Sequence, residues 1–199
     1  MRTESALEAI KRLRDLNAIP KTGFALDLGA GTGTDAFALT QMGYQVTAIE
    51  KDPLFADGIR KQHPEIEVFE QDMRHFLIGR ESYAIISAQY SLPFLVTAQD
   101  VFSLLDVIAE GLAPGGAMLF NVFGLKDPWV TEKPADVAFF EYGEITEWLQ
   151  KLPLATIWES RFLGYETRRS GGGKLWEIFS FTCLKRPLSE EVYHRIGVS

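Results

Sequence analysis

The most informative segment of the chain is Leu26-Asp27-Leu28-Gly29-Ala30-Gly31-Thr32-Gly33-Thr34. It ends an apolar run that predicts a strand, and its alternating glycines predict a tight turn where a ligand can lie against bare main chain. The helix expected after the turn would present its amide ends to that ligand. A glycine-rich turn alone is a weak signal, so its partners elsewhere in the chain decide its meaning.

The first partner is Glu50, which lies 21 residues after Gly29 at the end of the second predicted strand. An acid at this point of a nucleotide-binding fold accepts hydrogen bonds from both hydroxyls of a ribose. Loop and acid together therefore predict an adenosine-bearing cofactor. The alternative is a tight turn followed by a solvent-exposed glutamate.

The spacing of the glycines and the acid before them distinguish between cofactors. A dinucleotide site uses G-x-G-x-x-G beneath a pyrophosphate, whereas the spacing here is G-x-G-x-G. Asp27 precedes the loop by two residues. Its carboxylate would repel a pyrophosphate but suits the ammonium group of a methionine moiety, so the charge favours S-adenosylmethionine over NAD.

Short apolar runs alternate with helical periodicity along the rest of the chain, which predicts an α/β fold. We expect strands at 23–28, 44–50, 65–70, 83–88 and 117–122, followed by two long β segments around 154–165 and 174–185. We expect helices from the Ser5–Glu8 capping box, at 34–42, from Asp52-Pro53 to before His63, at 100–112 and at 144–151. The pattern predicts a Rossmann-like, doubly wound, mostly parallel seven-stranded sheet with a C-terminal antiparallel β-hairpin.

Two further motifs complete a family resemblance. Asp72-Met73 follows the third predicted strand, and the turn Leu112-Ala113-Pro114-Gly115-Gly116 precedes the fifth. With the glycine loop and Glu50, they make residues ~20 to ~125 resemble the class I S-adenosylmethionine-dependent methyltransferases. The resemblance implies one methyltransferase domain over 1–199, with an N-terminal helix (1–18), a cofactor-binding half (20–125) and an acceptor-side half (126–199).

The resemblance also implies roles for residues of this chain. The glycines would line the methionine and ribose, Glu50 would hold the ribose, and Lys51 would lie beside the adenine. Asp72 would accept from the adenine amino group, Met73 would contact the ring, and Gln89 would lie under the cofactor near the methyl donor. With Asp27, the expected cofactor-binding residues are Asp27, Gly29, Ala30, Gly31, Gly33, Glu50, Lys51, Asp72, Met73 and Gln89.

Within this class the second half is similar to the tellurite-resistance-type methyltransferases. The likeness is carried by the segments Tyr83–Ser87 and Leu92–Leu95, by the Gly-Glu-Ile-Thr-Glu-Trp helix at 143–148, and by the closing strand after the glycines at 171–173. It implies a small-molecule acceptor, S-adenosyl-L-methionine as cofactor and S-adenosyl-L-homocysteine as product.

Methyl transfer from a sulfonium is an in-line displacement that mainly needs alignment and exclusion of water, so no catalytic triad is expected. Our candidates on the acceptor side are Tyr90, Arg168 and Arg169. Tyr90 follows the fourth predicted strand, where ligands bind in open α/β sheets; its ring can equally close the core. Arg161, Arg168, Arg169 and Lys174 form either an anion-recognising edge or a solvated hairpin tip. The aromatic segment 123–142 is either a lid or packed core.

Composition bounds the partners. The 199 residues carry a net charge of −7, and an acidic surface disfavours a nucleic-acid substrate. No apolar stretch is long enough to span a membrane, so we expect a cytoplasmic protein. The basic residues Arg168, Arg169 and Lys174 favour a small, polar acceptor. His63, His75 and His194 lack metal-ligand spacing, so no metal is expected, and Cys183 reads as a buried hydrophobe rather than a nucleophile. The alternatives are a nicotinamide-dependent oxidoreductase or a cofactor-binding regulatory protein without catalysis.

Overall fold

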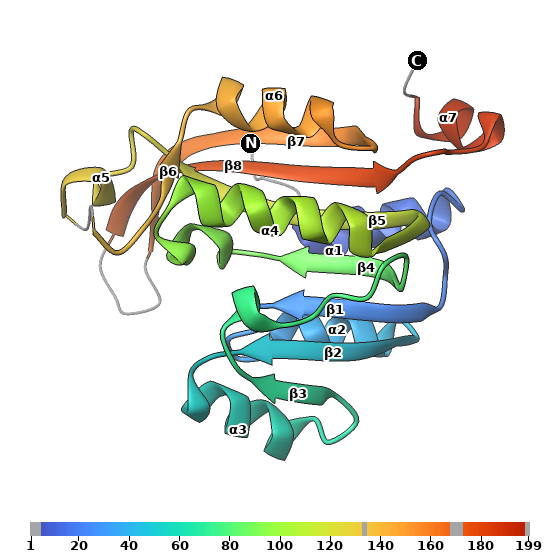
Figure 1. Cartoon of the computed structure of the whole chain (residues 1–199), viewed down its shortest axis with the longest axis horizontal. Helices are drawn as coiled ribbons and strands as arrows, with labels where there is room; N and C mark the ends of the chain where they lie inside the picture. Colours follow the sequence, from blue (N-terminus) through green and yellow to red (C-terminus); the bar gives the residue numbers. More distant parts are fainter. Residues whose placement is uncertain (1–4, 133–134, 168–172, 198–199) are drawn as a thin grey trace.

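One mixed sheet runs through the computed structural model, which describes residues 5–132, 135–167 and 173–197 (Figure 1). Its strands are β1 (Gly23–Leu28), β2 (Tyr44–Glu50), β3 (Glu67–Glu70), β4 (Tyr83–Ala88), β5 (Leu112–Gly124), β6 (Phe139–Phe140), β7 (Leu154–Thr167) and β8 (Gly173–Lys185). The helices are α1 (Ala6–Asp15), α2 (Thr34–Gln41), α3 (Pro53–Gln62), α4 (Ala98–Gly111), α5 (Trp129–Glu132), α6 (Tyr142–Lys151) and α7 (Glu190–Ile196), with the short 3-10 helices η1 (Met73–His75) and η2 (Leu92–Leu95).

The strands follow the order β3-β2-β1-β4-β5-β8-β7. The first five are parallel, while β8 runs antiparallel to both β5 and β7. The predicted seven-strand sheet and its closing hairpin are confirmed. An eighth strand, β6, pairs with the end of β5 inside the segment expected to be irregular. Two residues are too few to show a strand pattern.

Helices cover both faces of the sheet, so the doubly wound prediction is also confirmed. One buried cluster lies between the sheet and the helices α1, α2 and α3. A second lies between the other face and the helices α4 and α6, which stand in front of the sheet in Figure 1. Side chains alternate between the faces with period two: Leu26 and Leu28 of β1 enter the second cluster, and Ala25 enters the first.

Local caps explain where the predicted boundaries were right and where they shifted. The Ser5 capping box and the Asp52 N-cap are both present. Helix α4 begins two residues early because Thr97 accepts a hydrogen bond from the Asp100 amide at 3.0 Å. Strand β5 begins at Leu112, which pairs with Tyr83 before the intervening residues bulge out and the ladder resumes at Ala117. Strand β3 is shorter than predicted, and α6 starts two residues earlier.

Candidate functional site

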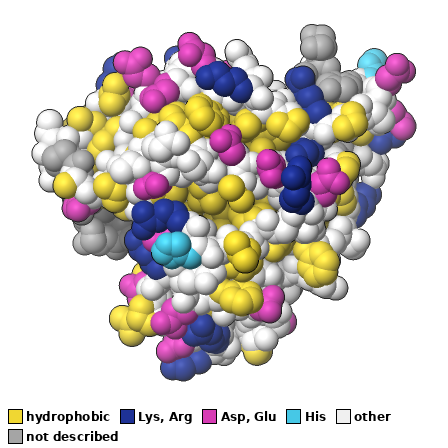
Figure 2. All heavy atoms as spheres, in the orientation of Figure 1, with side chains coloured by type: hydrophobic (Ala, Val, Ile, Leu, Met, Phe, Trp, Pro, Cys, Tyr) yellow, Lys and Arg dark blue, Asp and Glu magenta, His cyan; other side chains and the backbone are white. Residues whose placement is uncertain are grey.

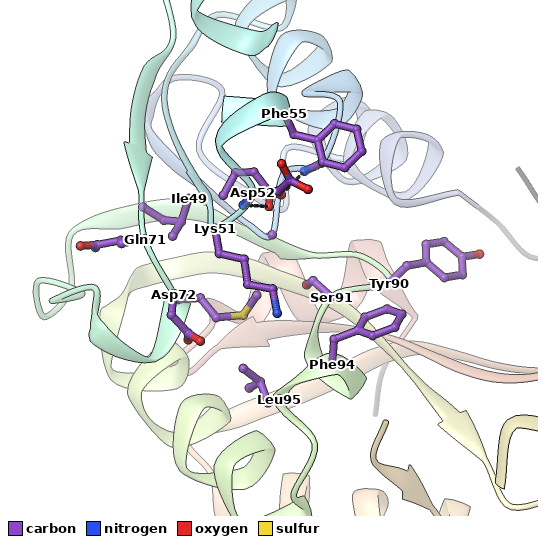
Figure 3. A pocket seen from close by; sticks show the side chains of 14 residues that line it. Ile49, Lys51, Asp52, Phe55, Gln71, Asp72, Tyr90, Ser91, Phe94 and Leu95 are labelled. Carbon is purple, nitrogen blue, oxygen red and sulfur yellow. Dashed lines mark hydrogen bonds between the residues drawn. The ribbon is translucent and has the colours of Figure 1, made fainter. Parts of the chain in front are cut away.

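A cavity of about 340 Å³ lies at the carboxyl ends of β1 to β4 (Figure 3). The strand order reverses beside β1, because β2 and β3 lie on one side of it and β4 and β5 on the other. Open α/β sheets bind ligands outside the strand ends at such a switch point. The cavity is lined by Gly29, Gly31, Ile49, Glu50, Lys51, Asp52, Phe55, Gln71, Asp72, Met73, Tyr90, Ser91, Phe94 and Leu95.

The glycine loop is tied to the end of β2, since the amides of Gly29 and Ala30 both donate to the carbonyl of Ile49, at 2.8 and 3.0 Å. Gly29 and Gly31 have φ of +74° and +54°, a conformation that favours glycine. A Cβ at Gly29 would lie 2.5 Å from Cβ of Ser91, whereas a Cβ at Gly31 would meet no atom within 4 Å. Gly29 is therefore required for packing, and Gly31 leaves its space to the cavity.

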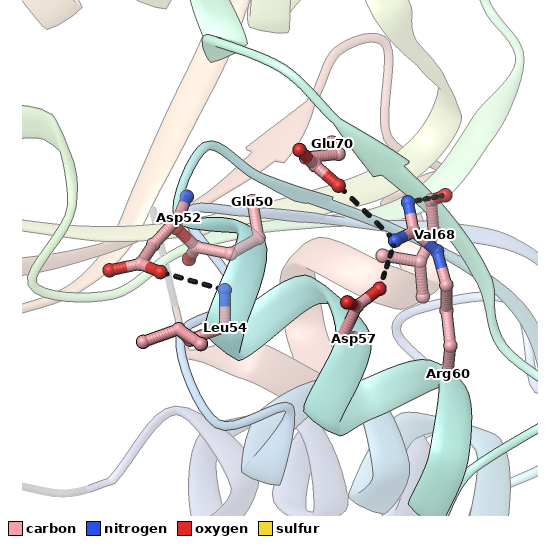
Figure 4. A network of polar contacts seen from close by, with 7 residues as sticks. All are labelled: Glu50, Asp52, Leu54, Asp57, Arg60, Val68 and Glu70. Carbon is pink, nitrogen blue, oxygen red and sulfur yellow. Dashed lines mark hydrogen bonds and ion pairs between the residues drawn. The ribbon is translucent and has the colours of Figure 1, made fainter.

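Glu50 connects this loop to helix α3. Its Oε2 accepts from the Gly31 amide at 2.6 Å, and its Oε1 accepts from the Asp52 amide at 2.8 Å. Asp52 in turn caps α3 through the Leu54 amide at 2.9 Å (Figure 4). A carboxylate has about four acceptor positions, so these two bonds use about half of its capacity. Glu50 can hold the loop and still accept from ligand hydroxyls.

Asp72 lines the cavity and is paired with Arg74. Its oxygens lie 3.0 Å from Nε and 2.7 Å from a terminal nitrogen of that guanidinium, and Oδ1 also accepts from the Arg74 amide at 2.9 Å. The hydrogen bonds from Arg74 lower the pKa of Asp72 to about 2. Asp72 is therefore an ionised acceptor at the edge of the cavity, as its predicted contact with an amino group requires.

Asp27 does not line the cavity, and it is 3% exposed on the α2 side of β1. Its Oδ2 lacks a hydrogen-bond partner, and so does the buried Oγ of Ser87 at the facing register position of β4. The pKa of Asp27 is raised to about 8, mainly by burial and also by the charges of Asp35 and Glu50, against the lowering effect of a hydrogen bond from the Ala36 amide. A direct contact between Asp27 and a ligand ammonium stays a prediction.

The raised pKa of Asp27 gives a test of its burial. Between the ordinary pKa near 4 and the folded-state value near 8, the unfolded chain has lost a proton that the folded protein keeps, so rising pH favours unfolding. The asparagine of Asp27→Asn has no carboxyl proton to lose, so this source of pH dependence is absent from the variant. We expect the variant to gain at least ~2 kcal/mol of unfolding free energy relative to the parent between pH 5 and pH 7.5 in urea titrations, since each pKa unit corresponds to ~1.4 kcal/mol. A pH-independent difference would contradict the shift; the exposed Asp15→Asn is the control.

Three other predicted cofactor residues, Ala30, Gly33 and Gln89, also do not line the cavity. Gly33 serves as the left-handed N-cap of α2. The Oε1 of Gln89 accepts instead from the side-chain amide of Asn121 on β5, at 3.0 Å. Gly33 thus caps a helix and Gln89 bonds Asn121. Ligand contacts of Ala30, Gly33 and Gln89 stay predictions.

The sequence reading missed seven lining residues, which are Ile49, Asp52, Phe55, Gln71, Ser91, Phe94 and Leu95. Most directly flank a predicted motif, so proximity to a strand end was the available signal. Ser91 is the informative addition because its Oγ is buried without a hydrogen-bond partner. A ligand in the cavity would give this hydroxyl a partner.

The basic hairpin prediction is corrected at Lys174. Its Nζ lies 2.5 Å from Oδ1 of Asp127, and both side chains are buried. The ammonium also lies 3.5 and 3.7 Å from the ring centroids of Trp129 and Trp176. Lys174 is therefore neither a solvated tip nor an anion receptor, since Asp127 already balances its charge. Arg161 packs its guanidinium 3.1 Å from the ring centroid of Tyr142, and the candidates Arg168 and Arg169 lie outside the described residues.

The aromatic segment 123–142, which begins at the end of β5, packs largely into the core. Phe123 and Phe140 are fully buried, and Trp129 lies edge-on against Phe123 and Trp176, with centroids 5.9 and 5.2 Å apart. Cys183 is buried as predicted, and burial raises the pKa of its thiol to about 12. Such a thiol is a poor nucleophile.

The described surface gives little specific information about the ligand. Within the described ranges, no helix is long and apolar enough to cross a membrane. Among the same residues, no three metal-ligating side chains gather. Figure 2 shows acidic and basic side chains interspersed over the face that carries α4 and α6. Among the described side chains that this view colours, basic groups do not gather into one continuous patch.

The strand order, the glycine loop after β1 and the acid after β2 are similar to those of the class I S-adenosylmethionine-dependent methyltransferases. Residues 25–116 match the family model described as a methyltransferase domain, which confirms the class predicted from the motifs. The matched segment ends within the turn before the central part of β5.

Individual proteins agree with this assignment. A dTDP-3-amino-3,4,6-trideoxy-alpha-D-glucopyranose N,N-dimethyltransferase from Streptomyces venezuelae is 28% identical over 110 residues, 55% of this chain and 44% of that protein. TehB from Haemophilus influenzae has a TM-score of 0.71 at 17% identity, covering 93% of this chain and 64% of TehB. Another structure is the Burkholderia thailandensis 1,6-didemethyltoxoflavin-N1-methyltransferase with bound S-adenosylhomocysteine, with a TM-score of 0.63 at 18% identity over 92% and 80% of the two chains.

Relatives named as ribosomal RNA small subunit methyltransferase A and rRNA adenine N-6-methyltransferase also match, at 29–33% identity. The alignments span roughly a third to a half of the curated relatives they match. The structural likenesses show the fold alone. The comparisons therefore do not identify the methyl acceptor of this protein.

Proposed function

We propose that this protein transfers the methyl group of S-adenosylmethionine to a small, polar molecule. Glu50 carries the proposal, because it stands at the end of β2, lines the cavity and holds the glycine loop by the Gly31 amide at 2.6 Å. This is the arrangement that accepts ribose hydroxyls in nucleotide-binding α/β folds. The family match over 25–116 and the small-molecule methyltransferases among the similar proteins support it.

The cavity fits such a cofactor on three structural grounds. Its volume of about 340 Å³ falls in the range of small-molecule sites. The space beyond Gly31 is open, and the buried Oγ of Ser91 lacks a hydrogen-bond partner that a ligand could supply. Glu50 would hold the ribose, while Asp72, Met73 and Lys51 would surround the adenine. A nicotinamide-dependent oxidoreductase has no such support from the comparisons.

The bound cofactor would supply a methyl group already activated by a sulfonium charge. The protein's part is then to orient the two reactants and exclude water. The backbone of Gly29 and Gly31 would contact the cofactor, and Tyr90 and Phe94 contribute aromatic rings to the cavity lining (Figure 3). We propose further that residues 20–125 form the cofactor-binding half and residues 126–199 the acceptor-side half, with the acceptor near these rings. Arg168 and Arg169 remain candidates for contacting it.

The decisive experiment is a panel of small-molecule acceptors incubated with S-adenosylmethionine, read by release of S-adenosylhomocysteine. Ribosomal RNA is included as a separate arm because some relatives are named as rRNA methyltransferases. Turnover of a small molecule supports the proposal, and turnover of RNA alone overturns its acceptor class. Cofactor binding with no turnover in any arm would favour a regulatory protein without catalysis.

Gly31→Val tests the cradle. The new side chain would project into open cavity space at a φ of +54° that valine resists. We expect folded protein that has lost S-adenosylhomocysteine binding in calorimetry. Gly43→Val is the matched control, because Gly43 also has a positive φ (+92°) and open space around it but lies outside the cavity lining. The control should lose stability and keep binding; normal binding by Gly31→Val would remove the loop from the site.

A further inference from the structure

The backbone of Tyr90 is in a conformation that tyrosine avoids. Its φ is 54°, in the left-handed region, although it is not a glycine. This region costs a non-glycine residue roughly 1–2 kcal/mol, so something else in the fold must hold it. Residues held in this way cluster at functional sites, and Tyr90 lines the cavity with half of its surface exposed.

The group that holds Tyr90 is the side chain of Asn121. Its Oδ1 accepts from the Tyr90 amide at 2.6 Å, and its Nδ2 donates to Oε1 of Gln89 at 3.0 Å. Asn121 is 1% exposed and follows Phe120, the last residue of β5 that pairs with β4. The side-chain amide of Asn121 therefore forms hydrogen bonds where the strand ladder ends, to the first two residues of the loop that leaves β4.

The opposite side of Asn121 is fixed as well. Strand β8 pairs along β5 in register, with Ser180 opposite Asn121. The amide group thus stands on a strand that has neighbours on both sides, so it is a rigid point from which to hold a strained loop. A strand in this position does not shift to relieve the strain at Tyr90.

We propose that Asn121 is a positioning residue that holds Tyr90 in its left-handed conformation, so that the tyrosine ring forms the wall of the cavity over the cofactor. This inference rests on the proposed function. Asn121 does not line the cavity and acts through Tyr90. Its contribution to ligand binding should therefore disappear when the Tyr90 side chain is absent.

The experiment is a double-mutant cycle on S-adenosylhomocysteine affinity, measured by calorimetry. The leucine of Asn121→Leu keeps a similar size and removes both hydrogen bonds, and we expect binding to weaken about tenfold. Tyr90→Gly should weaken binding to a similar degree, and the double variant should be no weaker than Tyr90→Gly. Asn121→Asp keeps the oxygen that accepts from the Tyr90 amide, so it should stay within about threefold of the parent.

Leu119→Ala is the control, because Leu119 lies two residues before Asn121 on the same face of β5, so the substitution opens a cavity and destabilises the same strand without removing a hydrogen bond to the Tyr90 loop. It should lower the melting temperature and leave affinity unchanged. Additive losses of affinity, or unchanged affinity in Asn121→Leu, would overturn the inference. If Asn121→Leu does not fold, Tyr90→Ala and Tyr90→Gly test the inference instead. Unchanged affinity in both variants would show that the Tyr90 ring does not contact the cofactor and would overturn the inference. A parent protein that does not bind S-adenosylhomocysteine refutes the proposed function instead.

Discussion

Lys174→Met should lower the free energy of unfolding by about 3–5 kcal/mol, because removing one partner of a buried ion pair leaves the other charge uncompensated. Asp127 would keep its carboxylate in a buried position, with the Trp129 amide at 3.0 Å as a remaining donor. The aromatic rings that surround the Lys174 ammonium would lose their cation as well. Urea denaturation followed by tryptophan fluorescence measures the loss.

Two comparisons make this expectation specific. Lys126→Met removes the same charge from an exposed neighbour of Asp127 and should change stability by less than about 0.5 kcal/mol. Lys174→Met combined with Asp127→Asn removes the unpaired charge while keeping one side-chain oxygen for the Trp129 amide. It should recover much of the loss. A Lys174→Met protein as stable as the parent would mean that the pair contributes nothing.

Glu50→Gln should weaken S-adenosylhomocysteine binding at least tenfold, because the amide replaces a charged acceptor in hydrogen bonds worth roughly 1.5–3 kcal/mol each. Glu50→Ala should weaken binding further and also lower the melting temperature. The second effect follows from the two backbone amides, of Gly31 and Asp52, that Glu50 accepts from. Calorimetry and thermal denaturation separate the two effects.

Glu70→Gln is the matched control for Glu50→Gln. Glu70 ends the neighbouring strand β3, lies outside the cavity lining and pairs with Arg60 at 3.3 Å (Figure 4). Its replacement should leave affinity unchanged. Equal affinities for Glu50→Gln and the parent would remove Glu50 from the ribose site and with it the main support for the proposed function.

Much of the cavity lining was predictable because the motifs that mark it are local in the sequence. The glycine loop, Glu50 and the Asp72-Met73 pair each follow a strand directly, and parallel strands bring their carboxyl ends to one edge of the sheet. Six of the ten predicted cofactor residues line the cavity for this reason. Gln89 does not line the cavity, and its Oε1 accepts from Asn121, 32 residues later in the chain, a contact that local motifs do not indicate.

Contacts between distant segments account for the rest of what was missed. Lys174 looked like one member of a basic hairpin because the sequence does not show that Asp127, 47 residues earlier, lies within reach of its ammonium. The left-handed φ of Tyr90 has no sequence signal either, since it depends on a hydrogen bond that the Tyr90 amide donates to Asn121 on β5. Charge and spacing along the chain predict a residue's neighbours only where the fold keeps those neighbours close in sequence.

The order of the last strands has a consequence for how the protein is made. During synthesis β7 leaves the ribosome before β8, yet β8 occupies the place between β5 and β7. The earlier strand therefore has no partner in the sheet until the later one arrives, and the open edge of β5 is exposed for the same interval. Unpaired strand edges pair readily with other chains. The nascent protein thus presents two open strand edges to other chains while β7 is already made and β8 is not.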